Sequence, residues 1–343
     1  MSVEVASGQA TPPPSIFFRT VNFIGAHTPG TSGHQVIVTQ RMTQSNAYIE
    51  WMQLVPGPTR IFWNERAFLP PSTVVRTSWS AAADGTDVRP EPDLFGARIG
   101  SSGIWKYYFD DDADQFARSL LDGSGAQLLG FGSNVALERL PFIDEDEQWL
   151  YYLGAELAAP PSDPDRRLAI LRGNISTAAV EEVLLSGRRF DTLLRYTMIF
   201  DPDHELIHLN GSGRFHDDFF PTPDSFLYQL DTSTNALIAF AGFQEGEGTI
   251  QQVALDPQNQ DYYFTLPGGY TDPQALHRMS YADLGVQSPY SASVVLDADP
   301  AIGPILQLDS HPTIRVPEPG ATQGGLIAFA MALLVRRGRK PIE

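Results

Sequence analysis

Short aromatic and aliphatic segments recur along this chain with a period of about 40 to 55 residues, and this repetition constrains its fold more than any other feature. In each unit a turn containing acidic residues precedes an apolar segment, and a second apolar segment follows after a loop. Equivalent positions are Tyr107, Tyr151, Ile207 and Tyr262 in the first segments, and Asp122, Gly173, Asp231 and Ala282 at the second ones. Because two sets of positions repeat at about the same interval, the pattern predicts structural repeats of the size of β-propeller blades.

The repeated segments have the character of β-strands. Trp149–Leu153 is short and aromatic, and turns such as Asp122-Gly123 and Asp256-Pro257 provide the geometry that joins antiparallel strands. The 29 glycines and 27 prolines are also typical of a chain with many turns. One such unit cannot bury both of its faces, whereas units packed radially cover one another. The sequence therefore predicts an all-β protein in which residues 16–315 form a single β-propeller domain.

Two further blades are expected outside the four clear units. Residues 35–80 contain Tyr48–Trp51 and Arg60–Trp63, which have strand character. Residues 293–315 are expected to form a blade together with residues 15–24, because joining the two ends of the ring removes exposed sheet edges. This arrangement gives six blades, and five blades is the alternative.

One unit resembles the blades of known propellers. It runs from Tyr107-Tyr108-Phe109-Asp110 through Arg118 to Leu121-Asp122-Gly123-Ser124-Gly125, and it is similar to the repeat of YWTD-type and TolB-like propellers. Leu230-Asp231-Thr232-Ser233 is a degenerate form of the same ending. The resemblance implies a six-bladed body, but a fold of this kind is compatible with many functions.

The C-terminal residues 316–343 have three parts. A proline motif comes first, an uncharged stretch rich in helix formers follows at Gly324–Val335, and a basic cluster comes last. The motif consists of Val316, Pro317, Glu318 and Pro319, and the basic cluster consists of Arg336, Arg337, Arg339 and Lys340. This order resembles the PEP-CTERM sorting signal of Gram-negative bacteria. The resemblance implies recognition and cleavage by an exosortase, with delivery of the protein to the cell surface.

The C-terminal residues 316–343 predict the cellular location of the protein. The apolar stretch is expected to form a short helix that contacts the inner membrane transiently, with the basic cluster retained on the cytoplasmic side as a stop signal. We therefore expect an exported protein of the cell envelope or cell surface. Residues 1–15 are polar and rich in proline, so we expect a disordered segment, and no signal peptide is visible at Met1.

Composition excludes several classes of function. The net charge of −18 at pH 7 disfavours nucleic acid as a partner, because both surfaces are negative. The chain has no cysteine, which excludes disulfides, thiolate metal sites and a cysteine nucleophile. No nucleophile elbow, phosphate-binding loop or dinucleotide motif is present, so we assign no catalytic and no cofactor-binding residue.

Several side chains are nonetheless candidates for binding. The acidic runs 110–114 and 144–147 either bind calcium or form solvated turns; they lack the spacing of a calcium loop, and we assign no metal ligand. His204 and His208 share a strand face near His216, although His208 alternates with apolar residues as an outward-facing strand residue does. Ser124 is expected to close a turn. The aromatic residues that could stack on sugars are Trp63, Trp79, Trp105, Trp149 and Tyr270. Among them, Trp105 and Trp149 occupy equivalent blade positions typical of core packing, and Trp79 is expected in a polar loop.

Two functions fit these observations. The first is a surface-sorted or secreted propeller that binds extracellular polysaccharide or a surface protein through its loops, without catalysis. The alternative is a propeller enzyme of the lactonase or glycan-cleaving type, with acidic residues or a metal in the axial channel. Carboxylate, asparagine or histidine side chains that converge at one mouth of the channel would favour the enzyme.

Overall fold

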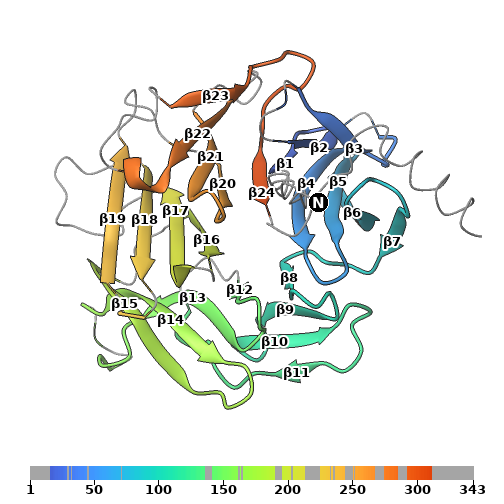
Figure 1. Cartoon of the computed structure of the whole chain (residues 1–343). Helices are drawn as coiled ribbons and strands as arrows, with labels where there is room; N and C mark the ends of the chain where they lie inside the picture. The colour runs from blue at the N-terminus through green and yellow to red at the C-terminus, as the bar shows by residue number, and fades with distance from the viewer. Residues whose placement is uncertain are drawn as a thin grey trace, which may run out of the picture.

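The structure is a computed structural model, and it describes residues 16–310 apart from short gaps. The gaps are 29–30, 32, 45, 71, 136–140, 161–162, 164, 190–194, 202–203, 213–224, 232, 235, 244–249, 251, 267–273 and 285–291. The described strands form six four-stranded sheets that surround a common axis (Figure 1). The chain is therefore a six-bladed β-propeller, as the repeats predicted, and the five-bladed alternative is wrong.

The blades are numbered here in chain order, and the strands of each are given from the axis outward. Blade 1 contains β24 (Gln307–Ser310), β1 (Ile16–Arg19), β2 (Phe23–His27) and β3 (Gln35–Thr39). Blade 2 contains β4 (Tyr48–Val55), β5 (Arg60–Leu69), β6 (Thr73–Ala82) and β7 (Arg89–Glu91). Blade 3 contains β8 (Ala97–Ile99), β9 (Trp105–Asp110), β10 (Gln115–Leu120) and β11 (Gln127–Leu128).

The second half of the ring is built in the same way. Blade 4 contains β12 (Phe142–Ile143), β13 (Trp149–Ala155), β14 (Arg167–Asn174) and β15 (Val180–Arg189). Blade 5 contains β16 (Arg195–Asp201), β17 (Leu206–Ser212), β18 (Ser225–Asp231) and β19 (Ala236–Phe243). Blade 6 contains β20 (Val253–Asp256), β21 (Asp261–Thr265), β22 (Leu276–Ser280) and β23 (Ser293–Leu296), with a short 3-10 helix, η2 (Tyr281–Asp283), after β22.

The two ends of the described chain close the ring. Strand β24 pairs antiparallel with β1, from Ile16 opposite Ser310 to Arg19 opposite Gln307. This pairing confirms the predicted closure, but two boundaries differ from the prediction. Residues 35–39 belong to blade 1 rather than blade 2, and residues 293–296 form the outer strand of blade 6. The alternation of apolar residues identifies a strand, but it does not say which sheet the strand joins.

The inner hairpins of blades 2 to 6 share one backbone feature. Each turn between the first and second strands contains a residue with a left-handed φ of 52° to 70°, which allows the chain to reverse within a few residues. The five residues are Thr59, Gly103, Glu147, Glu205 and Gln260, with φ values of 52°, 70°, 52°, 54° and 53°. We use the term turn face for the end of the propeller that carries the inner turns of blades 2, 3 and 4, residues 56–59, 100–104 and 144–148.

The outer hairpins repeat a second device. The carboxylate of Asp122 accepts hydrogen bonds from the amide (2.8 Å) and hydroxyl (2.7 Å) of Ser124. Asp84 holds Thr86 in the same way at 2.9 and 2.6 Å, and Asp231 holds Ser233 at 2.8 and 2.6 Å. Such side-chain turns fix the hairpin geometry without help from the core. The prediction that Ser124 closes a turn is therefore confirmed.

The hydrophobic core lies between neighbouring blades rather than in one central mass. For example, Tyr151 and Ile170 of blade 4 pack with Ile207 and Tyr228 of blade 5 in one buried cluster. Both faces of a blade are covered in this way, which explains why fully buried aromatic side chains such as Trp63 recur around the ring. Within the described part of the chain, no helix has the length and hydrophobicity needed to cross a membrane.

Candidate binding site

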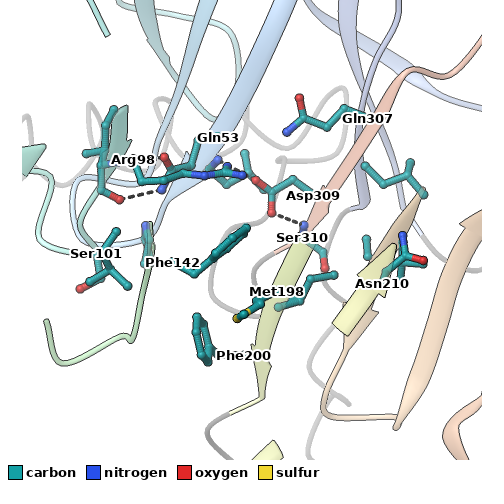
Figure 2. A pocket seen from close by; sticks show the side chains of 18 of the residues that line it. Gln53, Arg98, Ser101, Phe142, Met198, Phe200, Asn210, Gln307, Asp309 and Ser310 are labelled. Atoms are coloured by element: carbon teal, nitrogen blue, oxygen red, sulfur yellow. Dashed lines mark hydrogen bonds between the residues drawn. The ribbon is translucent and has the colours of Figure 1, made fainter. Parts of the chain in front are cut away.

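A pocket of about 370 Å³ occupies the axis of the propeller, where the inner strands of all six blades face one another (Figure 2). Its lining is mixed in character. Polar side chains include Gln53, Asn210 and Asp309, and apolar ones include Phe142, Met198 and Phe200.

Most of the polar groups in this lining hold adjacent inner strands together. Gln53 donates to the carbonyl of Ile99 (2.6 Å) and accepts from its amide (2.9 Å), which joins β4 to β8. Asp309 accepts from the amide of Leu54 at 3.1 Å, which joins β24 to β4. Side chains thus replace the backbone ladder between strands that belong to different sheets. The hydrogen-bonding groups of Gln53 and Asp309 are thus used to hold neighbouring blades together.

The centre of the pocket contains charges of opposite sign. Figure 2 shows the Arg98 side chain extending across the pocket toward Asp309. The guanidinium of Arg98 also lies over two rings, 5.2 Å from the centroid of Phe142 and 6.0 Å from that of Trp51. The cation therefore lies against aromatic surface at the axis.

A second, more open hollow of about 790 Å³ lies on the turn face. It shares Pro56, Ser101 and Glu145 with the lining of the axial pocket, so the two hollows adjoin each other. Its exposed side chains include Ile104, which is 54% exposed, and the carboxylates of Glu145 and Asp146. We call this hollow the turn-face groove. It combines apolar surface with negative charge.

Hydrogen bonds between successive turns give the groove a fixed shape. The amide of Gly57 in blade 2 donates to the carbonyl of Ser101 in blade 3 at 2.8 Å. The carboxylate of Glu147 in blade 4 accepts from the amide of Ser102 (2.7 Å) and from the hydroxyl of Tyr107 (2.8 Å). Burial, followed by the hydrogen bond to Glu147, raises the pKa of Tyr107, so the phenol stays a donor. Glu147 is half-buried in these contacts, whereas Glu145 and Asp146 are exposed.

The tryptophans take up different positions. Trp105 and Trp149 occupy equivalent positions in blades 3 and 4, and both are half-buried. The guanidinium of an arginine from the next strand lies over each indole ring. Arg118 is 4.5 Å from the ring centroid of Trp105, and Arg172 is 4.4 Å from that of Trp149. Both pack against core clusters, in agreement with their predicted structural role. Trp105 additionally lines the turn-face groove.

Trp79 is not in a polar loop, so this prediction was wrong. It lies in β6 opposite the fully buried Trp63 and packs against the core between blades 1 and 2. The neighbouring serines suggested a loop, but Ser78 and Ser80 are buried strand residues that hydrogen-bond to Asn64 and Glu91. Tyr270 lies outside the described residues.

The acidic runs form turns. An oxygen of Asp110 accepts hydrogen bonds from the amides of Asp112 and Ala113, both at 3.0 Å. Asp144 accepts from the amides of Gln148 and Trp149, both at 2.9 Å, although burial raises its pKa. Among the described residues, no group of three or more metal-ligating side chains comes together.

The predicted outward orientation of His208 is wrong. Its side chain is fully buried between blades 5 and 6, and its Nδ1 lies 2.9 Å from the hydroxyl of Tyr262. Strand alternation suggested an exposed position, but both faces of a propeller blade are covered by neighbours. His204 instead contacts the buried carboxylate of Asp201 at 3.0 Å. His216 lies outside the described residues.

The predicted sorting residues, Val316 to Pro319 and the basic cluster from Arg336 to Lys340, also lie outside the described residues, as do the apolar stretch 324–335 and the N-terminal segment 1–15. Their predicted roles stay predictions.

Comparison with known proteins identifies the fold. No protein-family model and no curated protein matches the sequence. A chain in a crystal structure of a nidogen/laminin complex superposes with a TM-score of 0.57 at 10% identity, covering 88% of this chain and 99% of that one. TolB from Acinetobacter baumannii superposes with a TM-score of 0.52 at 11% identity, covering 78% of this chain and 61% of TolB. These likenesses support the YWTD- and TolB-like propeller body and concern the fold alone.

Proposed function

We propose that this chain is an exported binding protein that holds an extracellular polysaccharide or a surface protein in its turn-face groove, without catalysis. The observation that carries the proposal is the groove itself, which presents Ile104, Trp105, Glu145 and Asp146 on a rigid frame of interlocked turns. Apolar and aromatic surface beside a few polar groups is typical of ligand-binding hollows.

The negative charge of the turn-face groove limits the classes of ligand that it can bind. Exposed carboxylates accept hydrogen bonds from sugar hydroxyls and attract lysine or arginine, but they repel uronate or sulfate groups. The net charge of −18 also favours basic ligands and disfavours anionic ones. The function therefore involves a neutral polysaccharide or a basic protein segment rather than an anionic polymer. The nidogen neighbour comes from a complex with laminin, which gives a precedent for protein binding by this fold.

Binding to three immobilised probes tests this function: a neutral glucan, a lysine-rich peptide and the anionic polymer alginate. The variant Glu145→Gln with Asp146→Asn is expected to weaken retention on the glucan or the peptide by about tenfold. A matched variant removes the same charge elsewhere, through Asp165→Asn and Asp297→Asn at exposed positions outside the groove. Equal binding by the two variants, or retention on alginate alone, would contradict the proposal.

The sorting step is a separate part of the proposal. It rests on Pro317-Glu318-Pro319, the apolar stretch Gly324–Val335 and the basic cluster that follows. An exosortase-type enzyme cuts near the proline motif after the apolar helix has entered the inner membrane, and this places the propeller at the cell surface. Intact-mass measurement of the surface fraction tests it: the mature protein should lack the residues after the motif. Replacement of Pro317, Glu318 and Pro319 by three alanines should leave the full-length chain in the membrane fraction.

A propeller enzyme is the second candidate, and the observation that favours it is that the Arg98 side chain extends across the axial pocket toward Asp309 (Figure 2). Arg98 and Asp309 are half-buried, and charged groups withdrawn from solvent beside aromatic surface are a frequent feature of catalytic channels. Assays with lactone and glycan substrates distinguish the two functions: turnover that is abolished by Asp309→Asn in a folded protein would favour the enzyme.

A further inference from the structure

The hairpin of blade 2 extends beyond its outer strand. β5 and β6 are ten residues long, and they pair without interruption from Arg60 opposite Ala82 to Leu69 opposite Thr73. The outer strand β7 pairs only with Ser78, Trp79 and Ser80. Among the described residues, the stretch 73–77 of β6 therefore has a strand partner on one side only. We call this stretch the open edge.

The hydrogen-bonding groups of the open edge can be assigned to a side. The amide of Ala82 donates outward to Thr86 (2.9 Å), whereas the amide of Ala83 donates inward to Thr59 (3.2 Å). Backbone groups alternate along a strand, so Arg76 and Val74 share the outward direction of Ala82. These two residues present N–H and C=O groups to the outer side, with the spacing of an antiparallel ladder.

The outer strand β7 is short and ends at Glu91, opposite Ser78. Pro90 is paired with Trp79 within β7, where its missing N–H lies on the side away from β6. After Glu91 the chain turns toward the axis, and the amide of Leu94 donates to the hydroxyl of Ser78 at 3.1 Å. β7 therefore stops before it covers residues 73–77.

Exposed apolar side chains accompany the open edge. Phe68, Val74 and Phe95 are 42%, 36% and 51% exposed, and Phe68 lies directly opposite Val74 in the sheet. The guanidinium of Arg66 lies 4.5 Å from the ring centroid of Phe68, and that of Arg76 lies 3.7 Å from that of Phe95. We call this group the blade 2 patch.

The patch is positive on a strongly negative protein. Arg66 and Arg76 both contact a single carboxylate, that of Glu50, at 2.9 and 3.2 Å. Two cations and one anion leave one positive charge, which attracts an acidic ligand. A second copy of this chain bound edge to edge would bring the same arginines against each other, which disfavours self-pairing.

We propose that the open edge accepts an extended peptide segment of another protein as an additional strand beside residues 73–77 of β6, with carboxylates of that segment facing Arg66 and Arg76. The outward groups of Val74 and Arg76 provide the backbone hydrogen bonds, and Phe68 and Phe95 provide apolar contacts. This surface is formed by blade 2 alone and does not depend on ligand binding in the turn-face groove.

Peptide binding measured by fluorescence anisotropy tests the proposal with two labelled probes of alternating composition, one of glutamate and valine and one of lysine and valine. The acidic probe is expected to bind at least about tenfold more tightly. Val74→Pro removes an outward N–H that the β5 ladder does not use, so it should abolish this binding while the thermal midpoint changes by only a few degrees.

A side-chain pair provides the matched control. Phe95→Ala should weaken binding of the acidic probe about fivefold or more, whereas Leu128→Ala, which truncates a similarly exposed apolar residue (53%) in blade 3, should not. Three results would overturn the proposal: no binding at about 1 mM acidic probe, unchanged binding by folded Val74→Pro, or a dimer in sedimentation that Val74→Pro dissociates. The last result would identify a second copy of the chain as the occupant.

Discussion

Gln307 and Met52 are joined by a reciprocal pair of hydrogen bonds, although 255 residues separate them in the sequence. The side-chain amide of Gln307 donates to the carbonyl of Met52 at 2.7 Å, and its oxygen accepts from the Met52 amide at 3.0 Å. Gln53 makes the same pair with Ile99 at 2.6 and 2.9 Å. A glutamine can therefore imitate a backbone peptide group between inner strands that belong to different blades.

Replacing Gln307 should destabilise the contact between β24 and β4 that helps to close the ring. In Gln307→Ala the amide and carbonyl of Met52 lose their partners in a partly buried position, and we expect a loss of about 1–3 kcal/mol in the free energy of unfolding. Urea denaturation followed by tryptophan fluorescence measures it. The control is Gln258→Ala, at an exposed turn position, which should change stability by less than about 0.5 kcal/mol. Equal effects of the two substitutions would show that the reciprocal pair is unimportant.

Glu65 is a fully buried carboxylate that fixes the connection between blades 1 and 2. It accepts hydrogen bonds from the amides of Arg41 (2.8 Å) and Met42 (2.6 Å) and from the indole of Trp63 (3.0 Å). Glu65→Ala removes the acceptor of three donors, of which the Trp63 indole is buried and the two amides are partly buried, so we expect a destabilisation of about 2–4 kcal/mol by urea denaturation, and a smaller one for Glu65→Gln.

The matched control for this carboxylate is Glu181, which forms an exposed ion pair with Arg172 at 2.7 Å. Glu181→Ala should cost less than about 1 kcal/mol, because surface ion pairs contribute little. If Glu65→Ala were no more destabilising than Glu181→Ala, the proposed role of Glu65 would be wrong.

His208 should make stability depend on pH. Burial lowers the pKa of His208 to about 3, whereas an unfolded histidine titrates near 6.5. Below about pH 6.5 the histidine binds a proton in the unfolded state but stays neutral in the folded state. The free energy of unfolding therefore decreases as the pH falls from about 6.5 toward 3. The loss at pH 5 is about 2 kcal/mol relative to pH 7.

A non-titrating replacement isolates this contribution. His208→Gln is expected to be less stable at pH 7, because it loses the bond to Tyr262, but to lose less stability between pH 7 and pH 5. Urea denaturation of both proteins at the two pH values gives the comparison. His27 and His277 also have lowered pKa values from burial, so part of the pH dependence should persist. An identical pH dependence in both proteins would exclude His208 as a source.

The parts of the fold that the sequence predicted are those with local signals. Asp122 and Ser124 form a turn from adjacent residues, and the repeated aromatic strands set the blade period and the number of blades. The closure followed from a general need to cover sheet edges, which Ile16–Arg19 and Gln307–Ser310 satisfy.

The residues that sequence patterns missed depend on distant partners. Nothing near Gln53 or Gln307 indicates that each binds a backbone in another blade. His208 was predicted to face outward because it alternates with apolar residues, yet a neighbouring blade packs on its side of the sheet. Glu65 lies between Asn64 and Arg66, and nothing in that segment indicates that its carboxylate is buried. The turn-face groove was missed for the same reason, since it is formed only when the turns of three blades meet.

The closing strand makes a final prediction about the C-terminal end of the propeller. β24 supplies the pairing with β1, and its Asp309 and Ser310 also bond to the amides of Leu54 and Leu255 in blades 2 and 6. A chain that ends after residue 306 would lose all of these contacts and leave the edge of β1 open, so we expect aggregation or loss of cooperative unfolding. A chain that ends after residue 315 keeps β24 and should unfold within a few degrees of the full-length protein. Thermal unfolding of the two truncated proteins measures this difference directly. Cooperative unfolding of the shorter protein would mean that the propeller folds without the pairing of β24 with β1. A large decrease in the thermal midpoint of the longer protein would mean that residues beyond 315 also stabilise the propeller.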